Sequence, residues 1–288
     1  MEISGKVGIV TGAASGIGRA TAAEFIKNGM SALALVDMAD NVHEIAADLS
    51  KNQGKLTGNG SGNGNGKGEH TCVVRPFQGD TTDPEFRREV FDTMRREHGL
   101  VNICVPAAGI TRDALAVKLN KEKGKANIYP LENFRQVVEV NLVAPIYWAL
   151  ELVAQTAEDR FTRGLKRWQP DEGMQGVIVF IGSVSSQGNK GQIAYASTKV
   201  GIEGAASTLM KEAMYYGVRC TVIHPGFTDT PMVRALGSEY IEGQVIPATQ
   251  IGRLIRPEEI ADAICFLVRN SAVSGQLWAD AGWHPMPT

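Results

Sequence analysis

Two side chains that could exchange a proton with a substrate lie four residues apart, in Tyr195-Ala196-Ser197-Thr198-Lys199. On a helix this spacing places Tyr195 and Lys199 on the same face. The ordinary pKa of tyrosine is near ~10, so a nearby lysine cation would favour the phenolate. Tyr195 could then exchange a proton with a substrate hydroxyl. Such a pair is common on helices, so the interpretation depends on what surrounds it.

A serine and an asparagine could support this chemistry. Ser183 follows the apolar run 177–181, which is typical of a buried strand. Open α/β sheets bind ligands at the carboxyl ends of their strands, so Ser183 could donate a hydrogen bond to a carbonyl or alkoxide oxygen. Asn141 is a polar residue in an otherwise apolar predicted helix, and a buried amide needs hydrogen-bond partners. It could hold a water molecule that connects Lys199 to solvent.

A glycine-rich turn, Thr11-Gly12-Ala13-Ala14-Ser15-Gly16-Ile17-Gly18, follows the first predicted strand and leads into a helix. Its backbone N–H groups and the positive helix N-terminus could bind a pyrophosphate. Asp37 ends the second predicted strand, where its carboxylate could accept hydrogen bonds from an adenosine ribose. The same charge would repel a 2′-phosphate, which favours NAD over NADP. Asp80, after the third predicted strand, could contact the adenine amino group.

These residues are spread along short apolar runs that alternate with longer helical patterns, as in parallel sheets with crossover helices. We predict strands at 6–10, 31–37, 72–77, 103–106, 176–181, 219–224 and 275–279. Helices are predicted at 17–28, 43–51, 85–98, 131–156, 194–216 and 257–269. The predicted fold is α/β: a single Rossmann-type, doubly wound parallel sheet with helices on both faces, in one domain that spans 1–288.

Two segments do not fit this alternation. Residues 54–68 contain little but Gly, Asn, Ser and Lys, which predicts a flexible surface loop. Residues 120–129 form a second, lysine-rich insertion that we expect to be exposed. No internal repeat is visible.

Composition limits the class of protein. With 43% hydrophobic residues, 21% charged residues and a net charge of -2, the chain is neither disordered nor a basic nucleic-acid binder. Its four cysteines are far apart in apolar surroundings, which predicts buried thiols rather than a disulfide framework or a metal site. The first residues lack an apolar signal region, and no uncharged apolar run reaches the roughly 18 to 20 residues of a membrane span. We therefore expect a cytoplasmic protein that does not associate with membranes.

The order and intervals of these motifs resemble the classical short-chain dehydrogenase/reductase family over essentially the whole chain. The glycine turn matches that family's Thr-Gly-x-x-x-Gly-x-Gly pattern, and Pro225-Gly226-Phe227-Thr228-Asp229-Thr230 matches a later motif. The resemblance implies a catalytic tetrad in which Tyr195 is the acid/base, Ser183 polarises the substrate oxygen, and Lys199 binds the nicotinamide ribose. Asn141 would support a proton relay.

The resemblance also implies a cofactor site, a lid and an assembly. The residues expected to bind NAD are Gly12, Ser15, Gly16, Ile17, Gly18, Asp37, Met38, Asp80, Thr81, Ala108, Gly109, Tyr195, Lys199, Pro225, Gly226, Phe227, Thr228 and Thr230. A substrate lid is expected at about 231–250. Family members are usually homotetramers that act on small molecules, here an alcohol or a ketone.

The chain departs from the family pattern in two places. Pro106-Ala107-Ala108-Gly109 stands where the family usually has Asn-Asn-Ala-Gly, so support for that loop must come from the backbone or from other groups. The interval from Ser183 to Tyr195 is one residue shorter than usual. This leaves Ser183 and Ser185 as alternatives, with the strand-Gly-Ser context favouring Ser183.

Three motifs resemble the 3-oxoacyl-(acyl carrier protein) reductase branch and its 17β-hydroxysteroid-dehydrogenase-like relatives. They are 108–115, Gly188-Asn189-Lys190-Gly191-Gln192, and Gly252-Arg253 followed by 256–261. Most carrier-protein reductases use NADPH, whereas Asp37 favours NAD. We therefore predict an NAD(H)-dependent enzyme that interconverts a secondary alcohol and a ketone. The alternatives are a 3-oxoacyl-thioester reductase and a non-catalytic nicotinamide-binding regulatory protein.

Two further groups of residues have competing interpretations. Arg160, Arg163, Lys166 and Arg167 form a basic cluster that is either a solvated helix end or a contact for an acidic carrier protein or coenzyme A. The first is favoured. Trp148, Trp278 and Trp283 are expected to pack or to lie at subunit interfaces, and 283–286 could reach a neighbouring subunit's site.

Overall fold

The sheet that carries the predicted motifs has seven strands, all parallel, in the order β3-β2-β1-β4-β7-β8-β9. This computed structural model describes residues 1–56 and 71–283. The strands are β1 (Val7–Thr11), β2 (Ala32–Asp37), β3 (Val73–Gln78), β4 (Ile103–Pro106), β7 (Gly176–Ile181), β8 (Val218–Pro225) and β9 (Gly275–Ala279). Between β1 and β4 the order reverses, so the carboxyl ends of these strands form the switch point at which doubly wound sheets bind ligands. The predicted fold class is confirmed.

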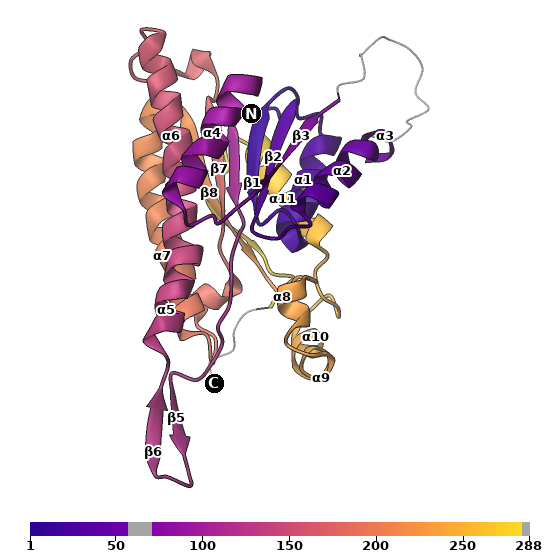
Figure 1. The fold of residues 1–288 in the computed structure, drawn as a ribbon, viewed down its shortest axis with the longest axis vertical. Coiled ribbons are helices and arrows are strands. Elements are labelled where there is room, and N and C mark those ends of the chain that lie inside the picture. The colour runs from indigo at the N-terminus through magenta and orange to yellow at the C-terminus, as the bar shows by residue number, and fades with distance from the viewer. Residues whose placement is uncertain (57–70, 284–288) are drawn as a thin grey trace.

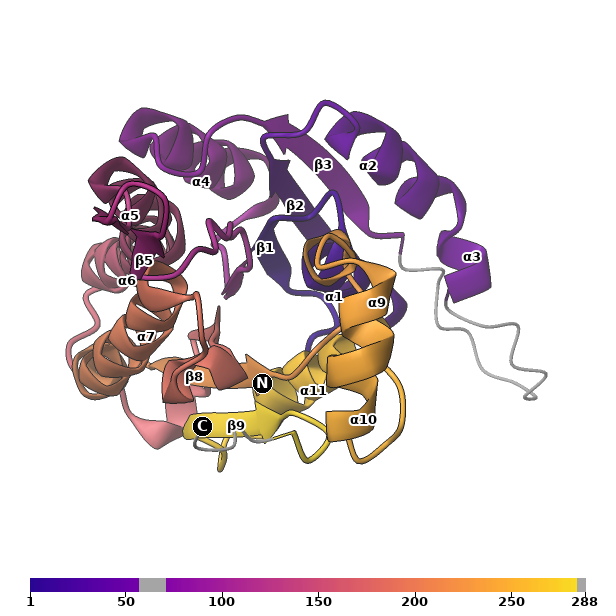
Figure 2. The same ribbon diagram turned by 90° about the horizontal axis from the view of Figure 1, so that it is seen from below.

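Helices cover both faces of the sheet (Figure 2). One face carries α1 (Gly16–Lys27), α2 (Val42–Lys51) and α11 (Pro257–Arg269). The other carries α4 (Pro84–His98), α6 (Ala144–Thr162) and α7 (Ile193–Glu212). The predicted strands and most predicted helices agree with these bounds to within one or two residues.

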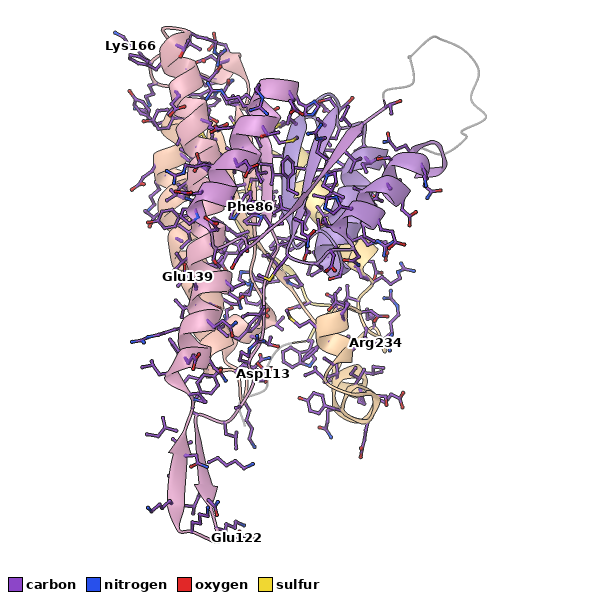
Figure 3. All side chains as sticks on the ribbon, in the orientation of Figure 1. Phe86, Asp113, Glu122, Glu139, Lys166 and Arg234 are labelled. Atoms are coloured by element: carbon purple, nitrogen blue, oxygen red, sulfur yellow. The ribbon has the colours of Figure 1, made fainter. Side chains whose placement is uncertain are left out.

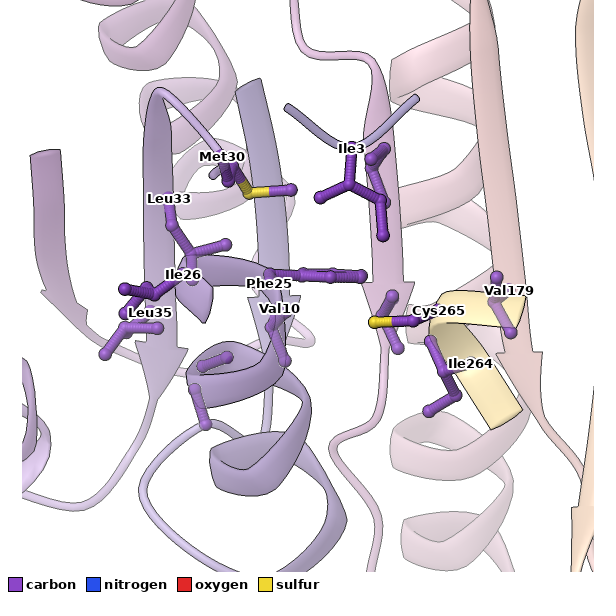
Figure 4. Close-up of a cluster of buried hydrophobic side chains, with 14 of the residues drawn as sticks. Ile3, Val10, Phe25, Ile26, Met30, Leu33, Leu35, Val179, Ile264 and Cys265 are labelled. Atoms are coloured by element: carbon purple, nitrogen blue, oxygen red, sulfur yellow. The ribbon is translucent and has the colours of Figure 1, made fainter. Parts of the chain in front are cut away.

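Two apolar clusters hold the layers together. In the first, shown in Figure 4, Phe25 and Ile26 of α1 pack against Val10 and Leu35 of the sheet. In the second, Trp148 of α6 is fully buried, and its indole N–H donates to the Thr81 carbonyl at 2.9 Å. Because buried backbone groups need partners, this bond also fixes the loop that follows β3. The expectation that Trp148 is a packing residue is confirmed.

A continuous helix of 32 residues runs along one side of the molecule, longer than the predicted 131–156. It comprises α5 (Leu131–Val138), a π-helical turn (Glu139–Val143) and α6 (Figure 1). By length and composition it could cross a membrane, with a mean hydropathy of 1.6 in its most apolar window. Its inner face packs on the sheet through buried residues such as Trp148 and Leu152, and a core helix passes the same test.

The insertions differ in what they build. Residues 120–129 belong to a β-hairpin of β5 (Val117–Asn120) and β6 (Lys125–Ile128), which extends beyond the body of the protein (Figure 1). It is exposed, as predicted, although no strands were expected there. The predicted loop 54–68 begins within the short helix α3 (Gln53–Leu56), and the rest of it lies outside the described residues.

The segment predicted as a lid is mostly helical. It contains α8 (Pro231–Arg234), α9 (Ser238–Tyr240), a π-helical turn (Ile241–Val245) and α10 (Ile246–Ala248). In Figure 1 these helices lie below the sheet, beyond the same end of its strands as the hairpin. Ile241, Val245 and Leu254 form a small apolar cluster that partly buries Phe227 and Val233.

All four cysteines, Cys72, Cys104, Cys220 and Cys265, are buried and free, as the sequence predicted. Burial raises the pKa of the Cys72, Cys220 and Cys265 thiols to about 12. Thiols of this kind behave as small apolar residues rather than as nucleophiles.

Candidate active site

Two adjoining cavities lie at the carboxyl ends of the strands, and together they collect every predicted cofactor residue. The larger, of about 410 Å³, is lined by Gly12, Ser15, Gly16, Ile17, Gly18, Asp37, Met38, Asp80, Thr81, Ala108, Gly109, Tyr195, Lys199 and Thr230 among others. The smaller, of about 120 Å³, is lined by Pro225, Gly226, Phe227, Thr228 and Thr230 among others. Tyr195 lines both, so it stands where the two cavities meet.

The glycine-rich turn is packed so tightly that side chains could not replace its glycines. Gly12 has a φ of +67°, and a Cβ there would lie 2.8 Å from the Ala108 nitrogen. A Cβ on Gly18 would lie 2.2 Å from the Gly12 carbonyl oxygen. No side chain caps the start of α1 at Ser15, so the first turn of the helix directs its N–H groups and positive dipole into the larger cavity. This arrangement fits a pyrophosphate.

Two aspartates line the same cavity. Asp37 Oδ2 accepts a hydrogen bond from the Ala14 N–H at 2.9 Å, and Oδ1 accepts one from the Ala39 N–H at 3.0 Å. These bonds hold the carboxylate at the end of β2 beside the glycine turn. Asp80 Oδ1 accepts from both the N–H and the hydroxyl of Thr82. Both carboxylates are therefore held in place by short local hydrogen bonds.

Side chains of Thr11 and Asn141 hold the loop after β4, where the two asparagines of the family pattern are missing. Thr11 Oγ1 accepts a hydrogen bond from the Ala108 N–H at 3.0 Å. Asn141 then binds Ile110 twice, because its Oδ1 accepts from the Ile110 N–H and its Nδ2 donates to the Ile110 carbonyl, each at 2.8 Å. The π-helical turn places this buried amide beneath the loop. These two bonds hold the loop in place, and the predicted water relay stays a prediction.

Tyr195 and Lys199 share one face of α7, as their spacing predicted. The Lys199 Nζ donates to the Ile181 carbonyl at 2.8 Å and lies 5.3 Å from the centroid of the Tyr195 ring. Burial lowers the pKa of Lys199 to about 8. The Lys199 cation is therefore held between the end of β7 and the tyrosine, where it borders the larger cavity.

The pKa of Tyr195 differs from our expectation. Burial raises it to about 12, a hydrogen bond with Ser183 lowers it in part, and the Asp113 carboxylate raises it further. We expected Lys199 to lower this pKa, and the structure does not show that effect. The reason is desolvation, which disfavours the phenolate more strongly than the neighbouring groups of the chain favour it.

Of the two serines that could polarise the substrate oxygen, Ser183 is favoured by its contacts. The pKa of Tyr195 is affected by a hydrogen bond with Ser183, not with Ser185. The Ser183 Oγ accepts from the Ser185 N–H at 3.1 Å, whereas the Ser185 hydroxyl donates to the Gln192 side chain at 2.8 Å. Ser183 therefore faces the tyrosine, and Ser185 belongs to another hydrogen-bond network.

Three polar side chains that line the smaller cavity were not predicted as site residues: Asp113, Asn189 and Gln192. They lie in the motifs that resemble one branch of the family. Gln192 lies three residues before Tyr195, so helical spacing could have indicated that it lies near the tyrosine. Asp113 comes from a loop far away in the sequence, and no local pattern marks it.

His224 lies behind the serine and was also missed. It is fully buried at the end of β8, where its ring stacks on Trp278 with centroids 4.2 Å apart. Its Nδ1 lies 3.3 Å from both the nitrogen and the oxygen of Ser183. Burial lowers the pKa of His224, so the ring is neutral at physiological pH. It therefore supports the backbone of Ser183 from inside the protein.

The predicted basic cluster is only partly exposed. Arg160 is 1% exposed, and it donates to the Lys166 carbonyl and to the Glu172 carboxylate. The expectation that the whole cluster is solvated is thus wrong for Arg160, because this side chain joins α6 to the following loop. Arg163, Lys166 and Arg167 are exposed. Trp283 packs edge-on against Phe227, and 284–286 lie outside the described residues.

Comparisons with known proteins establish the class. Residues 65–284 match a family model described as enoyl-(acyl carrier protein) reductase, and 6–59 match one described as short chain dehydrogenase. The chain belongs to the short-chain dehydrogenase/reductase family and is an oxidoreductase of that family.

Two relatives align with almost the whole chain. The chain is 30% identical to the 3-oxoacyl-(acyl carrier protein) reductase of Thermotoga maritima over 280 residues, 96% of each chain. It is 28% identical over 281 residues to the 3-hydroxyacyl-CoA dehydrogenase type-2 of Rattus norvegicus, covering 96% of this chain and 94% of the rat protein.

Solved structures support the fold. A short-chain dehydrogenase/reductase from Mycobacterium marinum superposes with a TM-score of 0.76 at 22% identity, covering 98% of this chain and 96% of that one. The NADPH-dependent 3-quinuclidinone reductase of Rhodotorula rubra gives a TM-score of 0.75 at 22% identity, covering 98% and 92%.

Proposed function

We propose that the protein is an NAD(H)-dependent oxidoreductase that interconverts a secondary alcohol and a ketone, with Tyr195 as the acid/base. The observation that carries the proposal is the position of Tyr195 at the junction of the two cavities, beside Lys199 and Ser183. The larger cavity would hold the dinucleotide, and the smaller one the carbonyl compound or alcohol.

The residues of the larger cavity fit a dinucleotide. Its glycine cradle admits no Cβ, and the uncapped start of α1 faces a position suited to a pyrophosphate. Asp37 would bind the adenosine ribose and Asp80 the adenine. A bound nicotinamide supplies or accepts hydride. Close to a carboxylate, a 2′-phosphate would be repelled, so Asp37 favours NAD over NADP.

Each side chain of the proposed catalytic tetrad would then have its own role in the reaction. In reduction, the Tyr195 phenol donates its proton to the substrate oxygen as negative charge develops there. The Ser183 hydroxyl donates a hydrogen bond to the same oxygen and stabilises that charge. Lys199 provides a cation that steadies the resulting phenolate. Asn141 holds the loop after β4 at the wall of the larger cavity, and in oxidation the proton moves in the reverse direction.

A 3-oxoacyl thioester is the second candidate substrate. It is favoured by the names of the relatives, which include a 3-oxoacyl-(acyl carrier protein) reductase and a 3-hydroxyacyl-CoA dehydrogenase. The reaction at the carbonyl is the same in both cases. If the substrate is a thioester, the protein should turn over acetoacetyl-coenzyme A. If it is a simpler alcohol or ketone, this turnover is not required.

Replacing the tyrosine tests the proposed chemistry. For Tyr195→Phe we expect kcat to fall by about 10²- to 10⁴-fold, because the proton donor is lost. Binding of NADH, measured by calorimetry, should stay within about twofold of the wild type. Tyr215→Phe, at a half-exposed tyrosine in the turn 213–216, is the matched control and should keep full activity. Retained turnover in Tyr195→Phe would remove this residue from the mechanism.

A further inference from the structure

One wall of the smaller cavity is built from hydrogen-bonded polar side chains that the proposed proton transfer does not use. The Gln192 Nε2 donates to Asp113 Oδ2 at 2.8 Å. The Gln192 Oε1 accepts from the Ser185 hydroxyl at 2.8 Å and from the Asn189 Nδ2 at 3.1 Å. These three bonds define which way the Gln192 amide points. The amide in turn fixes the Asp113 carboxylate at the cavity wall.

Asp113 carries the charge of this cavity. Among the described residues that line it, no other side chain is an acid, a lysine or an arginine. Phe227, Met232, Val233 and Leu236 line the same cavity with apolar surface. The cavity therefore combines an apolar wall with a polar wall that bears one carboxylate, that of the solvent-exposed Asp113.

Three cations in and around the site have hydrogen-bond partners other than Asp113. Lys199 lines the larger cavity and donates to the Ile181 carbonyl. Arg112, next to Asp113 in the sequence, donates to Gln136 and to the Thr111 carbonyl. Arg234 of the lid forms a two-pronged ion pair with Asp229. None of these bonds reaches Asp113, which Figure 3 shows between the long helix and the lid helices that carry Arg234.

We infer that Asp113 is a specificity-determining residue that selects uncharged substrates with a hydrogen-bond donor, such as an amide or hydroxyl, and disfavours carboxylates. The inference rests on the proposed function and names its substrate class. Asp113 Oδ2 is taken by Gln192, whereas Oδ1 has no bond to the described residues, so a substrate N–H or O–H could donate to it. A carboxylate at the same place would face a like charge.

The electrostatic environment of Tyr195 supports this placement. The Asp113 carboxylate contributes to raising the pKa of Tyr195, so its field reaches the proposed reacting centre. Asp113 and Tyr195 both line this cavity of about 120 Å³, so a substrate bound against the tyrosine shares the cavity with the carboxylate.

The test uses acetoacetamide and acetoacetate, an isosteric pair of ketones that differ in an amide and a carboxylate. With NADH, we expect the wild-type kcat/KM for acetoacetamide to exceed that for acetoacetate by at least about tenfold. In Asp113→Asn this ratio should fall by about tenfold, because the amide keeps an oxygen for Gln192 and removes the charge. Asp113→Ser removes the same charge without the amide and should give the same change.

Asp171→Asn, at an exposed aspartate in the turn 170–172, is the control and should leave the ratio unchanged. Equal or better use of acetoacetate by the wild type would overturn the inference, as would an unchanged ratio in both Asp113 variants.

A second measurement separates this inference from the proposed function. The same two compounds are titrated into Tyr195→Phe loaded with NADH, using calorimetry. Absence of all turnover in the wild type contradicts the proposed function, whereas tighter binding of acetoacetate in this titration contradicts the inference alone.

Discussion

At the scale of residues, the site combines two ionisable groups, the partly buried Tyr195 and the buried Lys199, whose pKa values have moved apart. Burial raises the pKa of the Tyr195 phenol and lowers that of the Lys199 ammonium to about 8. At neutral pH the tyrosine is therefore a neutral proton donor and the lysine a cation. This combination is the one that reduction of a carbonyl requires.

The pH dependence of reduction follows from these shifts. Below pH about 8 Lys199 is charged and Tyr195 is protonated, so kcat/KM for ketone reduction should be flat between pH 6 and 7. It should fall as the pH rises through about 8, because the lysine loses its proton. Oxidation of the alcohol should instead increase with pH, since it needs the phenolate. Initial rates at constant ionic strength check both directions, and a reduction rate that is constant to pH 10 would contradict the assignment of Lys199.

Residues with a local signature could be predicted from the sequence, and residues without one could not. Gly12, Gly18 and Asp37 lie at fixed offsets from a strand and a helix, so their places followed from the pattern. The carboxylate of Asp113 meets Gln192 only because two loops converge after folding. The raised pKa of Tyr195 could not be predicted either, because it depends on how deeply the side chain is buried, which the sequence does not give.

At the scale of elements, the end of α11 shows how a buried charge can stabilise a helix. The Arg219 guanidinium is 1% exposed and donates to the Leu267, Val268 and Val273 carbonyls. The N-terminal ammonium of Met1 donates to the Val268 and Arg269 carbonyls. Carbonyls at a helix C-terminus lack partners within the helix, and a cation there is attracted to the negative end of the helix dipole. Two cations therefore complete this end of α11.

Removing the buried cation should destabilise the protein. We expect Arg219→Met to lower the free energy of unfolding by about 2–4 kcal/mol, because three carbonyls lose a charged donor. Arg96→Met, at an exposed arginine of α4, should change it by no more than about 0.5 kcal/mol. Urea denaturation followed by circular dichroism measures both values. Equal stabilities would show that water or the Met1 ammonium replaces the guanidinium at no cost.

Elements with a buried face were easier to predict than exposed ones. The buried strands read as continuous apolar runs, and their bounds agree closely with the structure. The hairpin β5–β6 packs neither face, with Val117, Leu119 and Ile128 all more than half exposed. Its sequence therefore carries little of the burial pattern on which strand prediction depends. The π-helical turn at Asn141 was not predicted either, because the sequence pattern indicated one uninterrupted helix over 131–156.

At the scale of the whole molecule, the seven-stranded sheet brings three distant parts of the chain to one edge. The glycine turn follows β1, Asp37 ends β2, and the proposed catalytic residues Ser183, Tyr195 and Lys199 come from the end of β7 and from α7. Strand alternation predicted this arrangement, because parallel strands place their carboxyl ends on the same side. The homotetramer and the cytoplasmic location stay predictions.

The proposed NAD(H)-dependent reaction is tested most simply by comparing NADH with NADPH as the cofactor. Nicotinamide absorbance is followed while the protein meets acetoacetyl-coenzyme A, acetoacetamide or cyclohexanone, with NADH and NADPH supplied in parallel. We expect oxidation of NADH with at least one of these ketones, at a kcat/KM at least about tenfold above that with NADPH, or about 1.4 kcal/mol. Faster oxidation of NADPH would contradict Asp37 as the selector of NAD, and no oxidation with any ketone would contradict the proposed reaction.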